Sequence, residues 1–139
     1  AALEKSTVAD RIVTTGYVSF DALRLVYQRA LALCYPSLYE GFGLPVVEAM
    51  ACGTPVLTST GSSLDEVAAG AAIAVDPMSV DEIAEGMRRL CDSPDLRAEL
   101  SAKGSARAAQ LSWSRTARLT REVLQYVANG KLPRVEDDA

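Results

Sequence analysis

Short apolar runs alternate along this chain with segments in which apolar residues recur at helical spacing. The runs at 31–35, 55–59 and 73–75 carry no charged side chain. Runs of this kind are typical of parallel strands that helices cover on both sides. An earlier run at 11–18 contains several β-forming residues and is predicted as a further strand. The alternation therefore predicts an α/β fold, with a parallel sheet and flanking helices.

The most clearly bounded of the predicted helices covers residues 44–52. Pro45 stands at its first turn, where a missing N–H costs nothing, and Gly53 follows as the residue that ends the helix. The segments Ser63-Leu-Asp-Glu66 and Ser79-Val-Asp-Glu82 match the capping-box pattern of helix N-termini. Further helices are predicted at 21–30, 79–90, 93–109 and 112–128.

Length and composition limit the classes of protein to which the chain can belong. Its 139 residues suffice for one domain, and its apolar content of 49% excludes disorder as the main state. The sequence contains no run of about 18 apolar residues, so no membrane span is predicted. No basic and apolar leader with a cleavage site opens the chain, which favours a cytoplasmic location. The net charge of −4 argues against a general nucleic-acid-binding protein.

The chain has no histidine and only three cysteines, Cys34, Cys52 and Cys91. A Ser-His-Asp triad, a Cys-His pair and a histidine-ligated metal site are therefore excluded within the chain. The cysteines lie far apart in sequence and show no C-x-x-C spacing. They are interpreted as small buried hydrophobic residues of a protein in a reducing cytosol.

Basic residues are unevenly distributed, because no Lys or Arg occurs from Leu31 to Val80. An anion bound by this middle stretch must therefore be held by backbone N–H groups and helix N-termini, or by basic groups outside it.

The segment at 36–45 is the strongest candidate for chemistry, since it joins a predicted strand to the N-terminus of a predicted helix. Ligands of open α/β sheets bind at this edge. Gly41 and Gly43 would let the backbone approach a ligand closely and adopt positive φ. The N–H groups at the start of the helix would then face an anion such as phosphate. The alternative interpretation is a tight turn between strand and helix.

Two carboxylates frame this segment, Glu40 before the glycines and Glu48 within the helix. A carboxylate accepts hydrogen bonds at two oxygens, so it suits a vicinal diol of a ribose or hexose. Glu48 stands among apolar residues, where a charge requires a partner. A bound sugar hydroxyl and backbone N–H groups are the two candidate partners, and an ordinary solvated helix face is the alternative.

The stretch Glu40-Gly-Phe-Gly-Leu-Pro-Val-Val-Glu48-Ala-Met-Ala-Cys-Gly-Thr-Pro-Val56 resembles the E-x7-E signature of retaining GT-B glycosyltransferases of the group 1, or family 4, class. The resemblance continues upstream to Gly16-Tyr-Val18 and downstream to the Ser112-Trp-Ser-Arg115 helix start. It implies a Rossmann-like sheet within the C-terminal domain of a GT-B fold.

The resemblance also implies roles for individual residues. Glu48 would bind the ribose hydroxyls of a nucleotide-sugar donor, and Glu40 would lie beside the donor sugar as the catalytic residue. The backbone of Gly41, Phe42, Gly43 and Leu44 would meet the sugar and the diphosphate. Tyr17 and Val18 would border the nucleobase, and Ser62 and Ser63 would lie near the same site.

The implied reaction transfers a sugar, with retention, from a nucleoside-diphosphate sugar to an acceptor hydroxyl. Enzymes of this class generally need no bound metal, so no cofactor is expected. The acceptor, a glycan or lipid-linked sugar, would be bound by an N-terminal domain that this chain lacks, and the parent protein is compatible with peripheral membrane association. The alternative is a non-catalytic nucleotide-sugar-binding or interaction module. A Rossmann dehydrogenase is excluded because no G-x-G-x-x-G follows a strand with an acidic residue about 20 positions later.

The resemblance implies that residues 1–139 form a partial C-terminal domain. Apolar residues at helical spacing predict a C-terminal helix at 112–130, and the polar composition of 131–139 predicts a disordered tail. In the family's strand order, two strands absent from this chain lie between those predicted at 11–18 and 31–35. We therefore expect a fragment of a larger protein that does not catalyse transfer alone. The alternatives are strands borrowed from a second copy, or a four-stranded sheet with Ile12–Thr14 hydrogen-bonded beside Ala32–Cys34.

Overall fold

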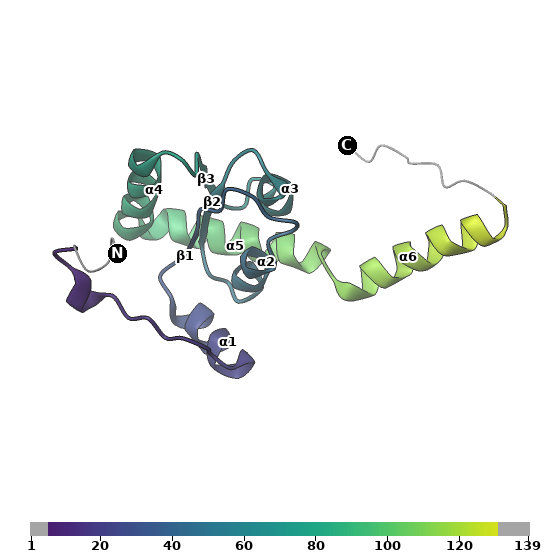
Figure 1. The fold of residues 1–139 in the computed structure, drawn as a ribbon, viewed down its shortest axis with the longest axis horizontal. Helices are drawn as coiled ribbons and strands as arrows, with labels where there is room; N and C mark the ends of the chain where they lie inside the picture. Colours follow the sequence, from purple (N-terminus) through teal and green to yellow (C-terminus); the bar gives the residue numbers. More distant parts are fainter. Residues whose placement is uncertain (1–5, 131–139) are drawn as a thin grey trace.

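The structure is a computed structural model that describes residues 6–130. Its centre is a parallel sheet of three strands, β1 (Leu33–Tyr35), β2 (Val56–Ser59) and β3 (Ile73–Val75), in the order β1-β2-β3 (Figure 1). All four residues of β2 are buried because the strand is paired on both edges and covered on both faces. The α/β class and the three later strands are thus confirmed.

The helices surround this sheet and agree with the predicted segments to within a few residues at each end. They are α1 (Phe20–Arg29), α2 (Leu44–Ala51), α3 (Ser63–Ala68), α4 (Val80–Asp92), α5 (Pro94–Gln110) and α6 (Trp113–Ala128), preceded by the short 3-10 helix η2 (Ala9–Arg11). The predicted C-terminal helix corresponds to α6. The predicted tail at 131–139 lies outside the described residues.

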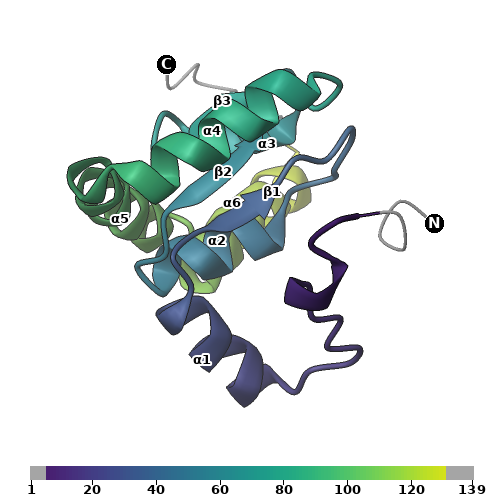
Figure 2. The ribbon, with the colours of Figure 1, turned by 90° about the vertical axis from the view of Figure 1, so that its left-hand side faces the viewer.

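Two hydrophobic clusters cover the two faces of the sheet, because successive residues of β2 point to opposite sides. Val56 packs with Val46 and Met50 of α2, in the cluster that also includes α3 and the end of α5. Leu57 packs in the second cluster, with Leu90 of α4 and residues of β3 and α5. Figure 2 shows the sheet between α4 and α2. Helix α5 contributes to both clusters and so joins the layers.

The strand predicted at 11–18 is absent, and this prediction was wrong. Arg11 ends η2, and the residues that follow run to α1 without joining the sheet. Val13 is 81% exposed, so the segment also lacks a buried face. A strand needs a neighbouring strand to satisfy its backbone groups, and none lies beside this segment in the described part of the chain. The four-stranded sheet with Ile12–Thr14 beside Ala32–Cys34 is likewise not formed.

The interpretation of the cysteines as buried residues was also wrong. Cys34 and Cys91 are exposed, and Cys52 is half-buried. Cys34 stands in the middle of β1, at one edge of the three-stranded sheet, with half-buried neighbours on either side. Its side chain therefore points to the face of the edge strand that no helix fully covers.

Candidate functional site

The segment between β1 and α2 lies at the carboxyl edge of the sheet and is tied there by hydroxyl groups of β2. The Oγ of Ser59 donates to the carbonyl of Ser37 at 2.6 Å. The Oγ1 of Thr58 donates to the carbonyl of Tyr35 at 3.2 Å. Both hydroxyl-bearing residues are buried. Because β2 is the central strand, these bonds fix the path of the segment relative to the core.

A third hydroxyl, from α3, holds the same segment further along. The Oγ of Ser63 donates to the carbonyl of Glu40 at 2.7 Å. Ser63 was predicted to cap α3, but the N-cap residue is Ser62, whose Oγ accepts from the N–H of Leu64. The side chain of Asp65 in turn accepts from the N–H of Gly61. Ser62 and Asp65 thus take the places that were predicted for Ser63 and Glu66, one residue earlier in the chain. The hydroxyl of Ser63 is therefore available to bond Glu40.

Helix α2 begins without a capping side chain. Its N-cap residue is Gly43, in the left-handed conformation with φ 95° and ψ 48°. The other α-helices of the described part have serine caps whose hydroxyls accept a backbone N–H: Ser19, Ser62, Ser79, Ser93 and Ser112. The positive end of α2 is therefore open to an external acceptor. Positive φ was predicted for both loop glycines, but Gly41 does not adopt it.

Glu40 receives a hydrogen bond from a residue that the sequence analysis did not single out. The phenol of Tyr35 donates to Oε1 of Glu40 at 2.7 Å. This hydrogen bond is the main cause of a raised pKa at Tyr35, with smaller contributions from burial and from the charge of Glu40. The phenol stays protonated and acts as a donor over the physiological range.

Glu48 has a similar but longer contact. The phenol of Tyr27, on α1, donates to Oε2 of Glu48 at 3.4 Å. Burial is the main cause of a raised pKa at Tyr27, followed by the charge and the hydrogen bond of Glu48. The carbonyl of Tyr27 accepts from Thr54 at 2.6 Å, which docks α1 against the chain after α2. Within the described residues the partner of Glu48 is therefore a phenol and not the backbone N–H group that was one of the two candidates, and the sugar hydroxyl stays a prediction.

The remaining predicted site residues differ in their placement. Phe42 and Leu44 lie at the loop and are 45% and 48% exposed. Gly43 is buried, and Ser62 and Ser63 stand at the start of α3 beside the loop. Tyr17 is 96% exposed and lies with half-buried Val18 in the segment before α1. The structure thus gathers the loop residues and the two serines, but it does not bring Tyr17 into their hydrogen-bond network.

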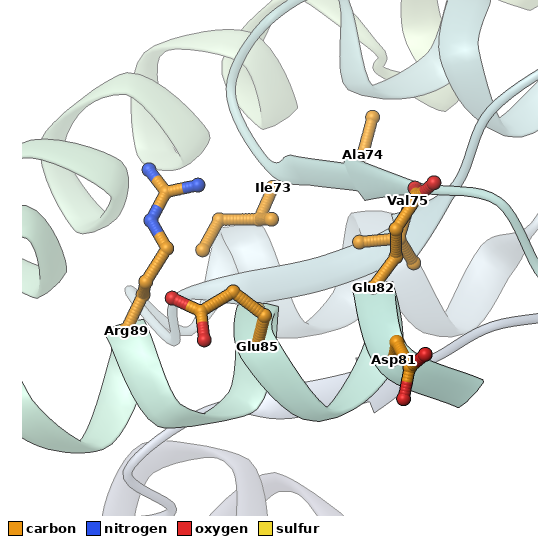
Figure 3. Close-up of a pocket in the computed structure, with 8 residues that line it drawn as sticks. Ile73, Ala74, Val75, Asp81, Glu82, Glu85 and Arg89 are labelled. Carbon is orange, nitrogen blue, oxygen red and sulfur yellow. The ribbon is translucent and has the colours of Figure 1, made fainter. Parts of the chain in front are cut away.

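A small cavity of about 90 Å³ adjoins the loop, lined by residues that include Gly41, Phe42 and Ser63. A larger cavity of about 340 Å³ lies between β3 and α4, and Figure 3 shows Asp81, Glu85 and Arg89 around it. It contains none of the predicted site residues.

Across residues 6–130, no three metal-ligating side chains stand close enough to hold a metal ion. None of the helices in this range has the length and apolar character of a bilayer-crossing segment.

Comparison with known proteins gives a consistent result. Residues 2–107 match the model of the family "Glycosyl transferases group 1". O-antigen chain mannosyltransferase B of Escherichia coli is 40% identical over 111 residues, which are 80% of this chain and 29% of that protein. The MMP alpha-(1->4)-mannosyltransferase of Mycolicibacterium hassiacum is 39% identical over 117 residues, 81% of this chain and 28% of that protein.

The fold is similar to that of sucrose-phosphate synthase from Thermosynechococcus elongatus, with a TM-score of 0.85 and 26% identity. The similarity covers 94% of this chain and 33% of that one. The predicted Rossmann-like part of a GT-B fold is thereby confirmed. The chain spans less than a third of the length of the two curated relatives described above.

Proposed function

The chain belongs to the group 1 glycosyltransferases, and from this premise we propose that it forms the donor-binding part of a retaining enzyme. The enzyme would move a sugar from a nucleoside-diphosphate sugar to an acceptor hydroxyl. The observation that carries the proposal is the arrangement of Glu40 and Glu48 on either side of the uncapped N-terminus of α2.

The start of α2 suits the diphosphate of the donor. Gly43 offers no side chain to cap the helix, and no acidic residue occupies its first turn. Backbone N–H groups and the positive end of the helix dipole therefore remain for a negatively charged group. No Lys or Arg occurs from Leu31 to Val80, so within this stretch these groups are the source of positive potential. Arg107 of α5 also lines the cavity beside the loop.

The two glutamates suit the hydroxyl groups of the donor. We assign Glu48 to the ribose, because both oxygens of its carboxylate can accept from a vicinal diol and its phenol contact is long, at 3.4 Å. We assign Glu40 to the transferred sugar, because it matches the first glutamate of the E-x7-E signature that the chain resembles. The phenol of Tyr35 holds its carboxylate at the loop.

The reaction forms a bond between the acceptor oxygen and the anomeric carbon of the sugar and breaks the bond from that carbon to the diphosphate. Negative charge develops on the departing diphosphate, so preorganised N–H donors at α2 would lower the barrier. In the retaining mechanism that we favour, the leaving phosphate oxygen takes the proton of the acceptor. This step needs no histidine base, which is compatible with a chain that contains none.

The cavity beside the loop, at about 90 Å³, is smaller than the roughly 300 Å³ or more of a typical small-molecule site. We propose that parts of the protein outside this chain complete the donor site, add cationic groups for the diphosphate and bind the acceptor. Because free cysteines suit a reducing compartment, we place the enzyme in the cytoplasm.

The names of the relatives suggest the sugar. Both curated relatives described above are mannosyltransferases. We therefore propose mannose as the first sugar to test, and we leave the base of the nucleotide to the experiment.

The test uses the complete protein that carries this chain. Binding of GDP, UDP and TDP and of their sugars is measured by titration calorimetry, and transfer to added glycan acceptors is measured by release of the nucleoside diphosphate. We expect one nucleotide series to bind, with sugar transfer from that donor. Binding without transfer to any acceptor would support a non-catalytic nucleotide-sugar-binding module instead, and the absence of binding would contradict the proposal.

A further inference from the structure

We infer that Tyr35 and Ser63 are positioning residues for sugar transfer, which together hold Glu40 in one orientation toward the donor. The inference rests on the proposed function of Glu40. Neither residue is assigned to touch the reacting atoms. Each would act through Glu40, Tyr35 on its carboxylate and Ser63 on its backbone.

The two contacts reach Glu40 from different elements. The phenol of Tyr35, at the end of β1, donates to Oε1 at 2.7 Å. The hydroxyl of Ser63, at the start of α3, donates to the backbone carbonyl at 2.7 Å. A loop residue that is bonded at both its side chain and its backbone loses most of its conformational freedom.

The residues that hold Glu40 are themselves fixed. Tyr35 is in register with Thr58 of the central strand, and its half-buried ring packs against the cluster that includes Val46 and Leu64. Ser63 directly precedes Leu64, which is fully buried. The positions of both donors are thus set by the core, and a site built on such rigid elements keeps its geometry.

The bond from Tyr35 also makes the carboxylate asymmetric. Oε1 of Glu40 accepts from the phenol, whereas no hydrogen bond from the described residues reaches Oε2. Glu40 is therefore prepared to accept from a single hydroxyl of the sugar in a defined direction. At Glu48 the phenol of Tyr27 is 3.4 Å away, so that carboxylate is held less firmly.

The role of the hydrogen bond from Tyr35 can be tested in the complete enzyme. Tyr35→Phe removes only the phenolic oxygen and keeps the ring in the core. We expect kcat to fall about tenfold, with the donor Kd within about twofold of wild type, since the lost bond orients a group that acts in transfer. The matched control is Tyr39→Phe, the same chemical change in the loop that follows β1, at a side chain that is 85% exposed. It should leave both constants unchanged.

Ser63→Ala provides an independent measurement. It should lower kcat by a smaller factor than Tyr35→Phe and again leave the donor Kd nearly unchanged. If Tyr35→Phe lowers stability too far for assay, as judged by urea unfolding, the split between kcat and Kd in Ser63→Ala decides the question.

Three outcomes would overturn the inference. The first is a kcat in both variants equal to that of the wild type, and the second is an equal loss of kcat and donor affinity. In either case the proposed function still stands if the wild-type enzyme binds the donor and transfers its sugar. A wild-type enzyme that binds no nucleotide sugar would overturn both. Activity of the wild type thus separates the two failures.

Discussion

The side chain of Leu64 occupies the space beside Gly43 in which any other residue would place its Cβ. Leu64 is fully buried, and Gly43 has a φ of 95°. The glycine that opens α2 is therefore required by the packing of α3 as well as by the backbone conformation of the loop.

Replacement of Gly43 by alanine should consequently destabilise the fold. The positive φ and the overlap with Leu64 each cost on the order of 1–3 kcal/mol, so we expect a loss of about 2 kcal/mol or more in the free energy of unfolding. Urea unfolding at constant m-value measures this loss. A larger side chain, as in Gly43→Val, would meet Leu64 as well and should therefore also lower the stability of the fold.

Gly41→Ala is the matched control in the same loop. A Cβ on Gly41 meets no atom within 4 Å, and its φ is not positive. We expect a change of less than about 1 kcal/mol, since compatible Gly-to-Ala changes are small. Equal losses in the two variants would show that Leu64 does not constrain the loop.

Glu48→Gln should weaken binding of the nucleoside diphosphate to the complete enzyme. A hydrogen bond to a charged group contributes about 1.5–3 kcal/mol, so Kd should rise roughly tenfold to a hundredfold. Titration calorimetry with the bare nucleotide measures this change. Glu85→Gln, an exposed residue of α4 in an ion pair with Arg88, is the control and should bind as wild type does. Unchanged affinity in Glu48→Gln would contradict the ribose assignment.

Glu40→Gln should affect the rate of transfer more than the binding of the nucleotide. Glu40 is assigned to the transferred sugar, so kcat should fall by a larger factor than the nucleotide Kd rises. Steady-state kinetics with the donor and binding of the bare diphosphate separate the two effects. A rise in Kd equal to the fall in kcat would place Glu40 at the nucleotide instead.

Local sequence signals were sufficient for most of the fold. The uncharged runs became β1, β2 and β3, and Pro45 and Gly53 marked the ends of α2 correctly. The strand prediction at 11–18 was wrong because β-branched residues favour a strand but do not supply the neighbouring strand that it needs. Strand formation depends on a neighbour, which composition does not reveal.

The contacts of the candidate site were less accessible to sequence reasoning. Glu40, Glu48 and the open start of α2 followed from a motif, whereas the phenols did not. Tyr27 precedes Glu48 by 21 positions, and the two meet only after α1 packs beside α2. The cap of α3 was predicted one residue too late, because the Ser63-Leu-Asp-Glu66 pattern does not reveal that Ser62 caps the helix while Asp65 accepts from the N–H of Gly61.

The two phenols predict a dependence of stability on alkaline pH. The pKa values of Tyr27 and Tyr35 are both raised above the ordinary value of 10.0. Above about pH 10 the unfolded tyrosines lose protons that the folded ones keep, so the unfolded state binds fewer protons. The free energy of unfolding should therefore be independent of these groups below that pH, and it should fall as pH rises through the folded pKa values.

Urea unfolding across this pH range tests the prediction, with Tyr35→Phe and Tyr27→Phe compared with wild type. Each variant should show a shallower fall in stability at alkaline pH, because one raised phenol has been removed. Tyr39→Phe, at an exposed position of the loop after β1, is the control for the loss of a phenol as such. A slope unchanged in all three variants would mean that the contacts with Glu40 and Glu48 are not formed in solution.

Arg107 should be important for the placement of α3 against α5. Its Nε donates to the carbonyl of Val67 at 3.0 Å, and its Nη2 donates to the carbonyl of Glu66 at 2.8 Å. The guanidinium thus satisfies two carbonyls in the last turn of α3, where a cation is favourable. Arg107→Met keeps much of the apolar stem and removes both donors, so it should lower the free energy of unfolding by about 1.5–3 kcal/mol.

Two further variants make this measurement specific. Lys103→Met, one turn earlier on α5, breaks an exposed ion pair with Glu99 and should have only a small effect on stability, since solvent screens such pairs. Arg107→Lys keeps the charge but lacks the planar fork, so it should recover only part of the loss.

Because α3 also carries Ser63, the Arg107→Met variant should lower kcat in the complete enzyme beyond the Lys103→Met control. Equal stability of the two methionine variants would show that the bonds to Glu66 and Val67 contribute nothing to the position of α3.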